Sequence, residues 1–70
     1  MSSVKFFNEE IVDDVTSRLY TSSDYSERII VLYRTNENKI VIIYYNENRI
    51  EEVDMENPTP DKIDKLIFSK

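Results

Sequence analysis

Acidic side chains are the residues of this sequence with the most obvious capacity for chemistry. They occur in adjacent pairs, such as Asp13-Asp14 and Glu51-Glu52, and general acid–base catalysis often uses two carboxyl groups. That chemistry needs one carboxyl group removed from water, which raises its pKa. These acids fall on polar faces, an edge strand and turns of the elements described below. We therefore expect them to be solvated and expect no enzymatic activity.

Metal binding is a second use of carboxylates, because calcium and magnesium prefer oxygen ligands. Asp54, Glu56, Asp61 and Asp64 could supply some of these ligands, but their spacing does not match a calcium-binding loop. The chain also has no glycine, which such a loop requires, and no histidine or cysteine, which are the common zinc ligands. We therefore expect neither a metal nor another cofactor.

The charges are segregated along the chain, which carries 14 acids against 9 bases and has a net charge of −5. Two acidic rows stand out, with Glu9, Glu10, Asp13 and Asp14 in the first and Glu47, Glu51, Glu52, Asp54 and Glu56 in the second. One interpretation is that they are solubilising charges that also keep an edge strand from pairing with other chains. The other is that they form a carboxylate array that occupies the Lys/Arg groove of a DNA-binding protein.

The five tyrosines suggest a third kind of chemistry, because aromatic side chains on a sheet can stack on single-stranded bases. Such sheets also need a positive groove. Residues 27–46, which hold most of the predicted sheet, carry only one more base than acid. We therefore expect no direct nucleic-acid binding, and tyrosines are equally suited to a sheet core or a protein interface.

Hydrophobic periodicity predicts the elements that position these residues. Residues 8–20 are predicted to form an amphipathic helix, because Ile11, Val12, Val15 and Leu19 follow helical spacing after a possible Asn8 cap. Residues 27–35, 39–45 and 49–55 are rich in β-branched and aromatic residues and are predicted to be strands. Thr59 is predicted to cap a second helix that has Pro60 at its first position.

Asn-Glu-Asn occurs twice, at residues 36–38 and 46–48, and each copy is predicted to form a hairpin turn. The predicted fold class is therefore α+β, a three-stranded antiparallel β-meander flanked by an N-terminal and a C-terminal helix (α-β-β-β-α) in a single domain of residues 1–70. Residues 40–45 are apolar on both faces, so one face is either covered by the helices or pairs with a second copy.

The whole chain resembles the small acidic early proteins with which large Bacillus phages take over their host, and more narrowly the DNA-mimic inhibitors of the nucleoid protein HU. The resemblance lies in size, acidity and the lack of catalytic residues. It implies an inhibitor in the bacterial cytoplasm that blocks DNA binding by HU, with no membrane association. Two alternatives remain: inhibition of a host enzyme such as RNA polymerase through an apolar sheet face, and a small self-assembling structural module.

Overall fold

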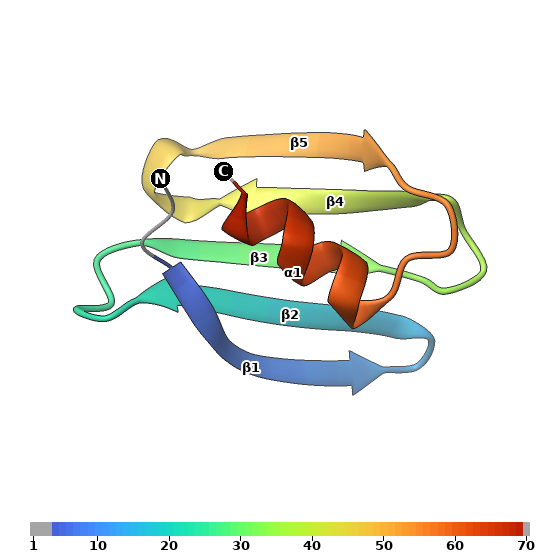
Figure 1. Ribbon diagram of the computed structural model, residues 1–70, viewed down its shortest axis with the longest axis horizontal. Coiled ribbons are helices and arrows are strands. Elements are labelled where there is room, and N and C mark those ends of the chain that lie inside the picture. The colour runs from blue at the N-terminus through green and yellow to red at the C-terminus, as the bar shows by residue number, and fades with distance from the viewer. Residues whose placement is uncertain (1–3, 70) are drawn as a thin grey trace.

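The computed structural model describes residues 4–69, which form a five-stranded antiparallel sheet followed by one helix (Figure 1). The strands lie side by side in chain order. Their bounds are β1 Val4–Val12, β2 Val15–Ser22, β3 Arg28–Tyr33, β4 Lys39–Tyr44 and β5 Arg49–Asp54, with a short 3-10 turn at Tyr45–Glu47 and the helix α1 at Pro60–Phe68. Within the described residues, no helix has the length and apolarity that crossing a bilayer requires.

The predicted α-β-β-β-α fold is wrong in its N-terminal part, because residues 8–20 form the β1–β2 hairpin in place of a helix. Val12 and Val15 pair across a two-residue turn, in which Asp13 has a φ of 58°. Aspartate tolerates this left-handed conformation, and the flanking β-branched residues favour strands. The helical spacing of the apolar residues here is coincidental.

The other predicted elements coincide with segments of the structure. Residues 27–35, 39–45 and 49–55 contain β3, β4 and β5, and the two Asn-Glu-Asn segments lie between these strands. The predicted role of asparagine holds at one of the two turns, since Asn48 has a φ of 48°. Thr59 caps α1 by accepting a hydrogen bond from the Lys62 backbone N–H, with Pro60 at the first helical position.

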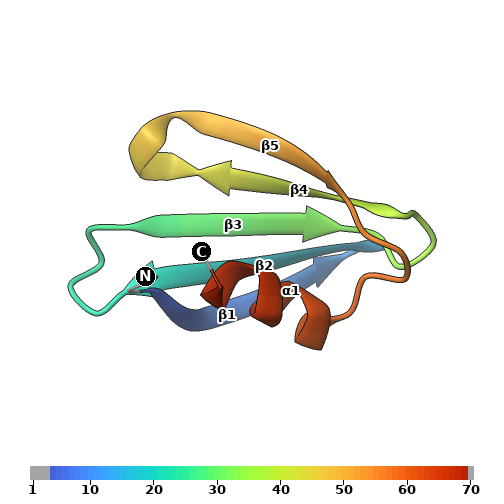
Figure 2. The same ribbon diagram turned by 45° about the horizontal axis from the view of Figure 1, so that its top comes forward.

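One face of the sheet packs against α1 and forms the core (Figure 2). Ile63 and Ile67 from the helix are fully buried against alternate residues of the strands. These strand residues face one way because side chains alternate across a β-sheet. The buried apolar side chains from the strands are Val4, Tyr20, Val31, Tyr33, Ile40, Ile42 and Tyr44.

The opposite side of the sheet, which we call the open face, carries no helix (Figure 2). Its apolar side chains are those that alternate with the core residues, and they are half-buried or exposed: Val12, Val15, Leu19, Ile30, Leu32, Val41, Ile43 and Ile50. Residues 40–45 were predicted to be apolar on both faces. In the structure α1 covers the face of Ile40 and Ile42 and leaves the face of Val41 and Ile43 uncovered.

Removing the cap of α1 tests how much this helix depends on its first turn. Thr59→Ala should lower the free energy of unfolding by about 1 kcal/mol, because the Lys62 N–H loses its acceptor. Urea denaturation followed by circular dichroism measures the change. Thr35→Ala, at an exposed position in the β3–β4 turn, is the control and should change stability by less than about 0.5 kcal/mol. Equal losses in both variants would contradict the assigned cap.

Candidate protein-binding surface

A buried arginine connects the first strand to the helix. Arg18 on β2 is 5% exposed and points toward α1. Its Nη2 donates to Asp64 Oδ1 at 2.8 Å, its Nε donates to Tyr20 Oη at 3.0 Å, and its Nη1 forms an ion pair with Glu9 on β1. Tyr20 also donates to Asp64 at 2.6 Å. We call these four residues the Arg18 cluster.

An aromatic ring completes the surroundings of the guanidinium group. The guanidinium carbon of Arg18 lies 4.3 Å from the centre of the Phe6 ring, within the range of a cation–π interaction. Burial alone would lower the pKa of Arg18, but its hydrogen bonds to Tyr20, Asp64 and Glu9 raise it. The arginine therefore stays charged, and the cluster holds β1, β2 and α1 together. Every buried polar side-chain atom of the described residues has a hydrogen-bond partner.

The first predicted acidic row is divided by the strand geometry. Neighbouring residues of a strand point to opposite faces, so Glu9 faces Arg18 while Glu10 lies on the open-face side of β1. Asp13 and Asp14 occupy the β1–β2 turn, where Asp14 pairs with Arg34 at 3.1 Å. Glu9 is thus engaged inside the protein, whereas Asp13 is exposed and has no ion pair within residues 4–69.

The second predicted row lies on the opposite edge of the sheet, on β5 and its flanking loops. Glu47 and Glu51 both pair with Arg49, and Glu52 pairs with Lys39. The last two members, Asp54 and Glu56, are exposed and have no ion pair with any residue from 4 to 69. The two rows therefore do not lie side by side along one surface.

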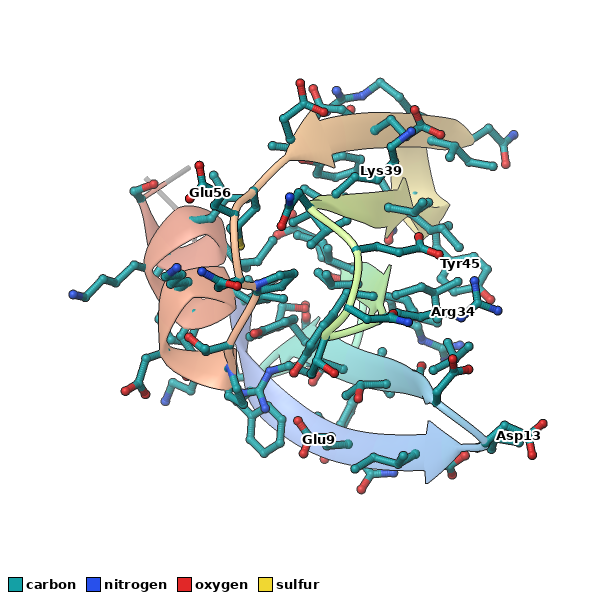
Figure 3. The ribbon with its side chains drawn as sticks, turned by 90° about the vertical axis from the view of Figure 1, so that its right-hand side faces the viewer. Glu9, Asp13, Arg34, Lys39, Tyr45 and Glu56 are labelled. Carbon is teal, nitrogen blue, oxygen red and sulfur yellow. The ribbon has the colours of Figure 1, made fainter. Side chains whose placement is uncertain are left out.

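Both rows nevertheless reach the same end of the sheet. The β1–β2 turn, the β3–β4 turn, the end of β5 and the start of α1 meet there (Figure 1), and Figure 3 views this end directly. We call it the turn end. Its acids are Asp13, Asp14, Glu37, Asp54, Glu56 and Asp61, and its bases are Arg34, Lys39 and Lys62.

Four of the turn-end acids form no ion pair within residues 4–69, and one of them, Asp54, lies opposite Lys39 in the sheet. Asp14 and Glu37 both pair with Arg34, but Asp13, Asp54, Glu56 and Asp61 are exposed and form no ion pair within the described part of the chain. Figure 3 shows Asp13 and Glu56 at opposite corners of this end. The two acidic rows predicted from the sequence did not include Asp61. Its position in the first turn of the predicted helix, a few residues after the end of the preceding predicted strand, is the signal that could have added it.

The tyrosines and the candidate metal ligands do not form sites of their own. Tyr20, Tyr33 and Tyr44 belong to the core, whereas Tyr25 and Tyr45 are exposed. Asp64 accepts hydrogen bonds from Arg18 and Tyr20, whereas Asp54, Glu56 and Asp61 are exposed. Within residues 4–69, no three acids converge in a way that would hold a metal ion.

Arg18→Met should lower the free energy of unfolding by about 3–5 kcal/mol, because Glu9 and Asp64 would remain partly buried without their counter-charge. Arg34→Met is the matched control. Arg34 also contacts two acids, but it is exposed, so the loss should stay below about 1 kcal/mol. Urea denaturation measures both changes. Similar losses in the two variants would contradict the assigned role of Arg18.

The ionisation of Tyr20 is expected to make the free energy of unfolding fall at alkaline pH. Burial and the hydrogen bond to Asp64 raise its pKa above the ordinary value of 10.0, although Arg18 opposes the shift. The folded state thus holds the phenolic proton more tightly than the unfolded chain. The contribution of Tyr20 to stability is complete below pH 10 and is lost as the pH rises above it.

Stability measured in urea from pH 9 to 12 tests this dependence, at ionic strength held constant. Tyr20→Phe should show a shallower alkaline decline than the wild-type protein. In an absorbance titration of tyrosine ionisation, Tyr20→Phe should also lack one of the ionisations that the wild-type protein shows at high pH. An unchanged decline in Tyr20→Phe would show that Tyr20 is not responsible.

Comparisons with protein-family models, with curated proteins and with solved structures found no match to this chain.

Proposed function

We propose that this protein is a non-catalytic inhibitor that binds the basic DNA-binding region of an HU-like nucleoid protein and excludes DNA. The observation that carries the proposal is the presence at the turn end of four exposed carboxylates that form no ion pair within residues 4–69, those of Asp13, Asp54, Glu56 and Asp61, spread from one corner of that end to the other. Carboxylates that are not neutralised within their own chain are available to lysine and arginine of a partner. The target class follows from the resemblance in size and acidity described above.

The fold supports such a role by limiting the movement of these groups. Asp13 lies in a two-residue hairpin turn, Asp54 is the last residue of β5, and Asp61 is in the first turn of α1. A partner that binds carboxylates already held in place loses less conformational entropy than one that must order them. A DNA-binding groove gains much of its affinity by neutralising negative charge, so a fixed acidic surface can compete for it.

Catalysis is a poorer explanation of the same residues. General acid–base chemistry requires a carboxyl group shielded from water, and the four unpaired turn-end acids are all exposed. The chain also contains no histidine or cysteine to act as proton carrier or nucleophile. Binding to a basic partner requires that these acids be exposed, whereas acid–base catalysis requires that one of them be shielded from water.

Charge reversal at the turn end tests the proposal. Purified HU is bound to a fluorescent DNA duplex, and the protein is added as a competitor. The wild-type protein should displace the DNA, and its affinity for HU should fall steeply as salt rises, because exposed charges are screened. Asp13→Lys combined with Glu56→Lys should weaken binding by about tenfold or more, since opposing charges would meet the basic groove.

The matched control places the same change of charge at the other end of the sheet. Glu27 and Glu47 are exposed in the β2–β3 and β4–β5 connections, and Glu27→Lys with Glu47→Lys should weaken binding by less than about threefold. Circular dichroism confirms that each variant is folded. Failure of the wild-type protein to displace DNA from HU would overturn the proposal. An equal loss of affinity for HU in both double variants would show that binding depends on the net charge of the protein and not on the turn end.

A further inference from the structure

The open face carries a continuous apolar row that crosses four strands. Leu19 on β2 pairs with Ile30 on β3, Ile30 pairs with Ile43 on β4, and Ile43 pairs with Ile50 on β5. Cross-strand neighbours on one face lie about 5 Å apart, so their side chains form one ridge. Ile50 remains 71% exposed, which leaves the β5 end of this ridge in water.

A hollow extends the apolar surface toward the turn end. It has a volume of about 410 Å³, and Val15, Leu32 and Val41 form its apolar part. Arg34, Lys39 and other charged residues border it. The open face therefore has an apolar centre with a charged border, which is the usual composition of a protein interface.

Charge on the open face differs from that of the protein as a whole. Alternation along the strands places on this side three bases and three acids, namely Lys5, Arg28, Lys39, Glu10, Glu52 and Asp54. Arg34, just beyond β3, pairs with Asp14 and Glu37. The chain as a whole has a net charge of −5. Two copies that meet through this face thus avoid most of the repulsion that other surfaces would cause. Lys39 and Glu52 already pair within one chain, so the border is largely neutral.

The dimensions of the molecule set an upper limit on the area of the open face. The molecule measures 34 Å by 22 Å in the plane of Figure 1. The rectangle that these lengths enclose, loops included, is roughly 750 Å², so an interface that covers most of this face is of the same order as the roughly 800 Å² that each partner buries in a standard interface. Two sheets packed face to face lie about 10 Å apart, which apolar side chains from both sides can fill.

We propose that the open face packs against the same face of a second copy of this chain, forming a two-fold symmetric dimer. The ridge of Leu19, Ile30, Ile43 and Ile50 is the centre of the interface. In this arrangement both α1 helices lie on the outside. This inference does not depend on the proposed binding of a nucleoid protein, because none of the turn-end acids belongs to the apolar ridge at the centre of the interface.

Sedimentation equilibrium of the purified protein is the test. At about 100 μM, where a dimer with micromolar affinity is nearly fully formed, the wild-type protein should have twice its monomer mass of 8.4 kDa. Ile50→Lys should raise the dimer dissociation constant by about tenfold or more, because a charged side chain would be buried without a partner. The combined change Ile43→Thr and Ile50→Lys should give a monomer.

Ile11→Lys is the matched control. Ile11 also lies on an edge strand and is 66% exposed, but it pairs with Thr16 and so lies on the helix-covered side. This variant has the same residue change, nearly the same exposure and the same change of charge, and it should remain a dimer. Circular dichroism and urea denaturation show that each variant is folded.

A wild-type protein that is monomeric at about 100 μM would overturn the proposal. So would a dimer whose dissociation constant is unchanged by both Ile50→Lys and the combined variant, since that dimer would use another surface. A monomeric protein that binds a different protein through Ile50 would also overturn the proposal, because that protein and not a second copy would cover the open face.

Discussion

The buried charge of Arg18 is the interaction on which the arrangement of this small protein depends. A guanidinium group removed from water is stable only when its hydrogen bonds are satisfied, and here the partners come from three elements. Glu9 belongs to the edge strand β1, Tyr20 to β2 and Asp64 to the helix. The charge therefore specifies where α1 lies on the sheet, while Ile63 and Ile67 supply the apolar contacts.

Placing α1 on one face determines how the two remaining surfaces are used. The helix covers the side of Arg18 and leaves the open face uncovered (Figure 2). The start of α1 lies toward the same end of the sheet as the β1–β2 turn and the end of β5 (Figure 1), and Asp61 belongs to the first helical turn. The centre of the apolar face and the acidic end thus occupy different parts of the molecule, and they share a border at Lys39 and Asp54.

Local pattern was sufficient to predict β3, β4, β5 and the start of α1, because β-branched runs and the Thr59-Pro60 cap are signals contained within a few residues. The N-terminal hairpin could not be recognised in that way. Its turn consists of two aspartates within a row of acids, and its apolar residues coincide with helical spacing. Arg18 gave no local signal either. Its burial depends on Glu9 and on Asp64, which lies 46 residues away in the chain.

The site could be predicted in part, since the acids were evident from composition, but their separation into engaged and unengaged groups depends on tertiary pairing. Glu9 and Asp13 belong to the same acidic row of the sequence, yet Glu9 pairs with Arg18 whereas Asp13 has no ion pair within residues 4–69.

Mapping amide chemical shifts of the labelled protein during titration with unlabelled HU tests the central claim most directly. The account predicts that the largest changes occur at residues 13, 54, 56 and 61 and that the open face is little affected. Changes centred on Leu19, Ile30 and Ile43, with none at the turn end, would contradict it.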